Sequence, residues 1–138
     1  MNLLKSTGML VVITFVLLSC SSAKVISTEK IEVNPGVLNS ELYYRFIIKV
    51  ETKKETLFKS ISIDSINILK FAVIDELTQL QSDSKKSYPK GKYLLQFELS
   101  SEKVLKKNKE LLELKLEQQG KITLLTTKVD SIKILKLR

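Results

Sequence analysis

The sequence predicts a mainly β protein, an antiparallel β-sandwich of about eight short strands with at most one short helix. Three observations predict it. Apolar and polar residues alternate over 42–51, 93–99 and 112–117, which is the pattern of half-buried strands. Turn signals separate such runs at Asn34-Pro35-Gly36 and at residues 88–91. The chain has 138 residues, 43% of them hydrophobic, which suits a single domain with one core.

We expect the strands to follow one another through short turns. Lys53 and Lys54 lie where a hairpin turn would join the second strand to the third. Residues 66–74 are rich in β-branched and aromatic residues, which favour a strand, whereas residues 76–86 are polar and predict a loop. In chain order, the expected strands cover residues 25–33, 42–50, 57–63, 66–74, 93–99, 112–116, 122–129 and 132–137.

The segment from 100 to 118 admits two interpretations. Ser100 or Ser101 could cap a helix of one or two turns over residues 100–110, or this stretch could be a loop. A longer helix over 101–118 competes, because Leu, Lys and Glu are good helix formers. The alternation at 112–117 and the following turn-like residues favour a strand there.

A short segment recurs near the C-terminus. Residues 63–70 and residues 129–136 are identical at six of eight positions. One interpretation is a pseudo-symmetric sandwich in which each half supplies one such meander, and the other is coincidence in a sequence dominated by Ile, Leu, Lys and Ser. In both, Asp64 and Asp130 suit corners where a side-chain oxygen accepts a hydrogen bond from a backbone N–H.

The first residues have the features of a secretory signal. Lys5 supplies a positive charge, and residues 9–18 form an apolar run. This run is too short to span a bilayer comfortably, because a spanning helix needs about 20 apolar residues. Ser19 and Cys20 follow, and the chain then turns polar. The pattern predicts a signal peptide over residues 1–19.

The run Leu17-Leu18-Ser19-Cys20 resembles the lipobox of bacterial lipoproteins, in which apolar residues and a small residue precede a cysteine. The resemblance implies cleavage before Cys20, diacylglycerol on its thiol and usually a further acyl chain, such as palmitate, on the new amino group. Several acyl chains would hold the protein on a lipid bilayer at about 0.8 kcal/mol per buried methylene. Because Ser21 rather than Asp follows, the resemblance implies the outer membrane, or the cell membrane in an organism with only one. No acidic run that resembles a surface-export tag follows Cys20, so we expect the protein to face the periplasm.

The chain is thus expected to have three parts. Residues 1–19 are the signal peptide, residues 20–24 are the lipidated Cys20 with a short tether, and residues 25–138 are a single β-sandwich domain. With one cysteine in the chain, no intramolecular disulfide is expected.

The positive charge is unevenly placed. The formal net charge is +8, of which Lys5 in the signal contributes one. Residues 20–80 hold eight basic and eight acidic residues, whereas residues 81–138 hold fourteen and seven. A basic half can meet an anionic surface or an acidic partner, but lysines interleaved with apolar residues are typical of a solvated face. We expect no nucleic-acid partner, because the chain is predicted to be exported.

The sequence lacks the usual groups of catalytic sites. It has no His, the commonest general base and metal ligand, and acylation would consume its single thiol at Cys20. None of the phosphate-binding, dinucleotide-binding or nucleophile-elbow motifs occurs among its four glycines. Asp75 and Glu76 are adjacent, so on a strand they would face opposite sides rather than one metal. We expect no catalytic residue, metal site or cofactor.

One set of residues is a candidate interaction surface. Tyr43, Arg45 and Ile47 alternate with the apolar residues of the strand at 42–50 and share its other face. Tyr and Arg are favoured at interfaces, but a second buried sheet face would explain the set equally well.

Two classes of function stay open. The first is a non-enzymatic binding or accessory module that is held at the membrane and contacts an envelope protein or polymer. The second is a small-molecule carrier or a His-independent enzyme of the envelope. The fold alone does not decide between them. A deep pocket lined by convergent acids would favour the second, and an exposed apolar or basic patch would favour the first.

Overall fold

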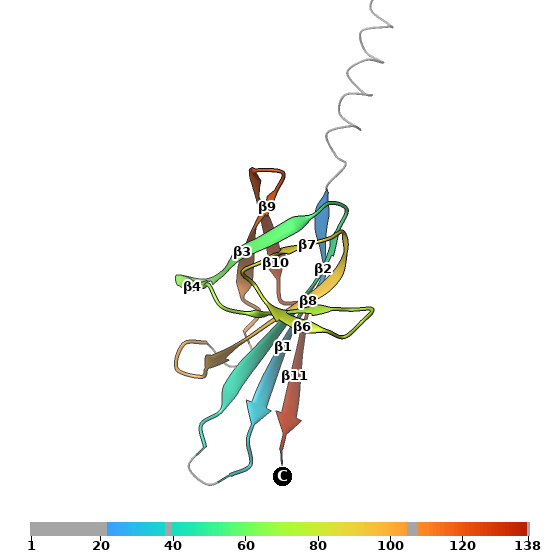
Figure 1. Ribbon diagram of the computed structural model, residues 1–138. Helices are drawn as coiled ribbons and strands as arrows, with labels where there is room; N and C mark the ends of the chain where they lie inside the picture. The colour runs from blue at the N-terminus through green and yellow to red at the C-terminus, as the bar shows by residue number, and fades with distance from the viewer. Residues whose placement is uncertain (1–21, 38–39, 105–107, 138) are drawn as a thin grey trace, which may run out of the picture.

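The protein is a sandwich of two β-sheets, as predicted (Figure 1). The computed structural model describes residues 22–37, 40–104 and 108–137, and these residues form strands and turns without a helix. Sheet A has six strands in the order β11 (Ser131–Lys136), β1 (Ala23–Asn34), β2 (Tyr43–Thr52), β8 (Gly91–Ser100), β5 (Ala72–Asp75) and β6 (Gln81–Asp83). Sheet B contains β10 (Lys121–Lys128), β9 (Leu111–Gln118), β3 (Thr56–Ile63) and β4 (Ile66–Ile68), and β7 (Ser87–Tyr88) pairs with β3.

The core lies between the sheets and is built from alternating residues. On β2, the even-numbered residues from Tyr44 to Thr52 are buried, and the odd-numbered residues are half-buried. Phe46 of β2 stacks on Phe97 of β8, with ring centroids 5.1 Å apart. Sheet B faces these rings with the fully buried Leu112, Leu114 and Leu116 of β9. The period-two pattern therefore marks one buried face on each strand.

The first and last strands are neighbours in sheet A. β1 pairs antiparallel with β2 and parallel with β11, so that Glu29 lies opposite Ser131. The link from β10 to β11 changes sheets at Asp130, whose Oδ2 accepts a hydrogen bond of 2.8 Å from the backbone N–H of Thr28. The backbone N–H of Asp130 donates in return to the Thr28 carbonyl at 2.9 Å. The side chain expected to satisfy a backbone N–H at this corner does so on β1.

Three predictions for the segment between residues 53 and 86 differ from the structure: one strand, one loop and one hairpin turn. The expected strand at 66–74 is divided into β4, in sheet B, and β5, in sheet A. The polar stretch 76–86, predicted as a loop, contains β6 and is joined to β5. Lys53 and Lys54 do not close a hairpin, because the chain crosses there from β2 in sheet A to β3 in sheet B. Local sequence marks where a strand ends, whereas the sheet that receives the next strand depends on distant partners.

Of the two interpretations of the repeated segment, the topology does not support the pseudo-symmetric sandwich. Residues 63–68 close a hairpin between β3 and β4 within sheet B, with Asp64 at a φ of 52°. The similar residues 129–136 leave sheet B and enter sheet A as β11. The preceding links differ as well, since β9 and β10 form a hairpin but β2 and β3 do not. Both copies favour a corner and a strand, but their positions in the fold are not equivalent.

The first strand starts earlier than expected, and the segment expected to be a short helix or a loop is described only in part. β1 begins at Ala23, so residues 23 and 24, predicted as tether, belong to the sheet. Residues 101–104 form turns. Residues 105–107, in the segment expected to be a short helix or a loop, lie outside the described residues.

A β-bulge in β1 reverses which of its side chains face the core. The register with β2 shifts between Val25 and Ser27, and the intervening Ile26 is 43% exposed. One extra residue exchanges the inward and outward positions of the rest of a strand. Beyond the bulge the inward residues are therefore Thr28, Lys30 and Glu32, all of them buried.

Candidate functional site

The described chain is fastened to the sandwich at its first residue. The Ser22 carbonyl accepts hydrogen bonds from the backbone N–H of Lys53 (2.8 Å) and from Nε2 of Gln118 (3.3 Å). The Ser22 hydroxyl also donates to the Gln118 side chain. Gln118 is itself held by Thr56, whose hydroxyl lies 2.9 Å from its Nε2. Ser22 therefore marks one end of the sandwich, where β1 starts and β2 ends; the last strand, β11, points to the opposite end (Figure 1). Cys20 lies outside the described residues.

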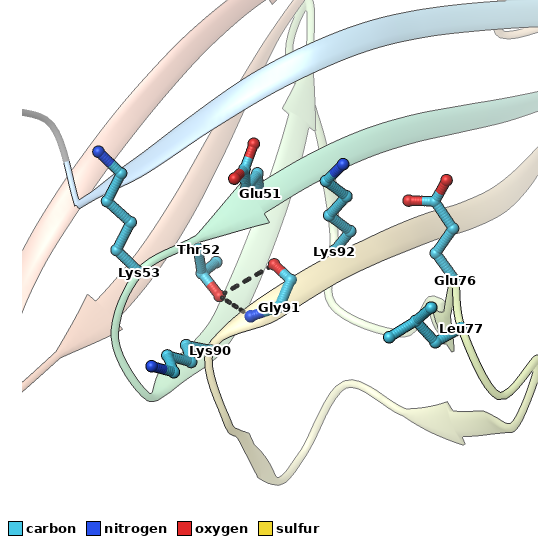
Figure 2. A pocket seen from close by; sticks show the side chains of 8 residues that line it. All are labelled: Glu51, Thr52, Lys53, Glu76, Leu77, Lys90, Gly91 and Lys92. Atoms are coloured by element: carbon cyan, nitrogen blue, oxygen red, sulfur yellow. Dashed lines mark hydrogen bonds between the residues drawn. The ribbon is translucent and has the colours of Figure 1, made fainter.

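An open cleft of about 720 Å³ lies next to this end. Its walls come from the end of β2, the start of β8 and the turn after β5. Figure 2 shows the Thr52 hydroxyl bonded to the backbone N–H (3.3 Å) and carbonyl (3.4 Å) of Gly91, which joins two of these walls. Leu77, 94% exposed, extends from the turn after β5 toward β8 (Figure 2). The cleft is lined by Glu51, Thr52, Lys53, Glu76, Leu77, Lys90, Gly91 and Lys92.

The cleft has an unbalanced positive charge. Both lining acids are paired with lysines outside the lining: Glu76 with Lys49 at 2.7 Å, and Glu51 with Lys24 at 3.7 Å. Within the described part of the chain, the three lining lysines form no ion pair. These lysines are Lys53, Lys90 and Lys92. The arrangement suits an anionic group, and the paired carboxylates do not converge as a catalytic or metal-binding pair would.

The predicted interaction residues share the outer face of sheet A. Tyr43, Arg45 and Ile47 are each half-buried, and no second layer covers them in the described structure. Arg45 is engaged by Glu98 on β8, with Nε and Nη2 each 3.1 Å from Oε1. Tyr43 is opposite Ser100, and Ile47 is opposite Gln96. The three residues do lie together, away from the cleft, but the Arg45 charge is already neutralised.

A second group of polar residues lies inside the sandwich. Lys30 on β1 is fully buried, and its Nζ lies 2.6 Å from Oε1 of Glu110, just before β9. Lys30 Nζ also donates to the Asn108 carbonyl at 3.0 Å and lies 4.6 Å from the centroid of the Tyr44 ring. Glu32, buried on the same face of β1, is the register partner of Tyr44. These four side chains, Lys30, Glu32, Tyr44 and Glu110, are called the buried charge cluster below.

The cluster acts on the acidity of its tyrosine. Burial raises the pKa of Tyr44 above the usual 10.0, and the negative charges of Glu32 and Glu110 raise it further. Tyr44 therefore stays neutral at physiological pH. Its hydroxyl and Oε2 of Glu110 are buried without a hydrogen-bond partner among the described residues, a costly state for polar atoms.

Sequence reasoning missed both the cleft and the buried charge cluster. The cleft joins residues from three separate segments. The sequence around a polar turn residue does not show which distant residues will lie next to it. For the cluster a signal was present, since Lys30 and Glu32 sit two apart in a strand and so share a face. Only the bulge at Ile26 decides that this face is the inner one.

No described helix is long and apolar enough to cross a bilayer. Residues 22–37, 40–104 and 108–137 contain no group of three or more metal-binding side chains. No protein-family model matches the chain, and no curated protein matches it significantly.

Proposed function

We propose that the protein is a lipid-anchored envelope lipoprotein whose sandwich is a non-enzymatic binding or accessory module, held with its Ser22 end against the bilayer. One observation carries the proposal: Ser22 is hydrogen-bonded to both Lys53 and Gln118. Two residues span at most about 7 Å, so an acylated Cys20 would bring this end of the sandwich to the head groups. The proposed site is the outer membrane, facing the periplasm, or the cell membrane in a single-membrane organism.

The cleft supports a role at the membrane surface. The three lysines that line it lie beside the Ser22 end and have no ion-pair partner among the described residues. A lysine near an anionic membrane surface contributes about 1 kcal/mol. The rest of the basic residues are spread along the molecule: Lys121 starts β10 opposite Gln118, whereas Lys128 ends it at the far end. The membrane contact therefore rests on the cleft lysines and not on the basic C-terminal half as a whole. The far end, and the outer face with Tyr43, stay accessible to an envelope protein or polymer.

The anchor is tested by Cys20→Ser. Serine has no thiol to alkylate, so we expect metabolic labelling with a fatty-acid analogue to mark the wild type and not the variant. Ser22→Ala, which keeps Cys20, is the control and should be labelled like the wild type. Equal labelling of wild type and Cys20→Ser would disprove the anchor.

The orientation is tested with a soluble fragment of residues 22–138 and phospholipid vesicles. We expect binding to anionic vesicles at low salt, and release as the Debye length falls to about 8 Å. Lys53→Gln/Lys90→Gln/Lys92→Gln should weaken binding about a hundredfold, because three contributions of about 1 kcal/mol are lost. Lys103→Gln/Lys109→Gln/Lys128→Gln removes the same charge at the far end and should bind like the wild type. Equal losses in the two variants would rule out this orientation.

A further inference from the structure

The buried charge cluster joins the two sheets at one contact. Lys30 belongs to β1 of sheet A, and Glu110 immediately precedes β9 of sheet B. Their side chains are 0% and 2% exposed, and Nζ and Oε1 are 2.6 Å apart. The backbone on both sides is fixed: Lys30 is in register with Phe46, and the Glu110 carbonyl accepts from the N–H of Val129 at 3.0 Å. An amine and a carboxyl group are thus held together in a rigid interior site that is closed to bulk water.

We propose that Lys30 and Glu110 condense into an amide that covalently links the two sheets, with the Glu32 carboxylate as the proton carrier. The ammonium of Lys30 gives a proton to the carboxylate of Glu110, which leaves a neutral amine facing a neutral carboxylic acid. The amine lone pair attacks Cδ of Glu110, so the Nζ–Cδ bond forms. Glu32 takes a proton from Nζ and returns it to the departing oxygen, the Cδ–O bond breaks, and one water leaves. No oxidant, reductant or cofactor is needed, and Glu32 ends as it began.

The surroundings favour this step in two ways. A buried ion pair carries a desolvation penalty that its attraction need not repay, and the amide removes both charges. Before condensation, Oε2 of Glu110 has no hydrogen-bond partner among the described residues. Condensation also leaves Glu110 with one oxygen in place of two. The rings of Tyr44 and Phe46, 4.6 and 5.9 Å from Nζ, flank the reacting amine.

The closeness of the Lys30 amine to the Glu110 carboxyl group accelerates the proposed condensation. Reacting groups held about 3–3.5 Å apart in a fixed site react as fast as they would if one of them had a concentration of roughly 10⁵–10⁸ M. Amide formation in water is opposed by bulk water, which this interior excludes. Glu32 lies two residues along β1 on the same inward face, and its charge and that of Glu110 both act on Tyr44. The second carboxylate is therefore inside the same cluster.

Peptide mapping tests the amide directly. The full-length protein, purified from whole cells that express it, is denatured and digested with trypsin, which does not cleave after an acylated lysine. We expect a branched peptide that joins residues 25–45 to residues 110–115 and is lighter than its two parts by one water. Quantitative recovery of separate peptides 25–30, 31–45 and 110–115 from the folded wild type would overturn the proposal. This readout does not depend on lipidation, so it can fail while the proposed function holds.

Matched variants assign the roles. Lys30→Arg keeps the charge but has no amine that forms this amide, and the branched peptide should be lost. Glu32→Gln should also lose it, because the proton carrier is gone, while Glu29→Gln on the outer face should keep it. Circular dichroism of each variant confirms that a lost cross-link is not a lost fold. A branched peptide of wild-type yield in Glu32→Gln would overturn the role of Glu32.

Discussion

Phe46→Ala is expected to lower the free energy of unfolding by about 3–5 kcal/mol, as large-to-small changes of fully buried aromatic residues do. Phe46 is 0% exposed and stacks on Phe97. Truncation removes this contact and leaves a cavity between two packed sheets, which relax only in part. Denaturant melts monitored by circular dichroism measure the loss.

The matched control for Phe46 is on the opposite face of the same strand. Lys49 is half-buried, and its ion pair with Glu76 is partly solvated, so Lys49→Ala should cost less than about 1 kcal/mol. Comparable losses for the two variants would mean that the faces of β2 are assigned wrongly.

Lys30→Met is expected to cost about 3–5 kcal/mol, because it removes the partner of a buried charge. Glu110, whose side chain is 2% exposed, would then hold its charge without the ammonium. Methionine matches the length of the lysine stem, so packing against Tyr44 and Phe46 is largely retained. The loss, read from denaturant melts, therefore reflects the unpaired charge of Glu110 and the absence of the proposed cross-link rather than lost packing.

The double variant Lys30→Met/Glu110→Leu separates charge from packing. With both members replaced by apolar side chains, the uncompensated charge of Glu110 disappears, and the double variant should be more stable than Lys30→Met alone. A double variant as unstable as the single one would show that packing, rather than charge, sets the cost.

The sequence was sufficient to predict strands where a strand's own residues decide its faces. Tyr44, Phe46 and Ile48 alternate with half-buried residues, and Leu112, Leu114 and Leu116 alternate with exposed ones. The connections between strands were harder to predict. The division of 66–74 between two sheets and the crossing at Lys53 depend on which distant strand offers a free edge, and no local pattern records that.

The candidate sites were predicted less well than the fold. Tyr43, Arg45 and Ile47 do share an outer face, since alternation fixes their direction. Lys90 lies in a recognised turn, but its position beside Lys53 follows from the pairing of Thr52 with Gly91. For Lys30, the single bulged residue Ile26 decides whether the ammonium faces solvent or contacts Glu110. Such a one-residue shift leaves the composition of the strand unchanged, so hydrophobicity patterns do not show it.

The parallel pairing of β1 with β11 has a consequence for how the chain folds. The second half of β1 gains its outer neighbour only when Ser131 reaches Glu29, so nearly the whole chain must be released before the first strand has both neighbours. Contacts between residues so distant in sequence close slowly, because loop-closure entropy must be overcome first. Until then β1 has an open edge along its second half, the half that carries Lys30 and Glu32. A nascent or truncated chain that lacks β11 therefore presents an unpaired strand, a site for pairing with another chain. Addition of the last strand covers this edge of β1 with β11.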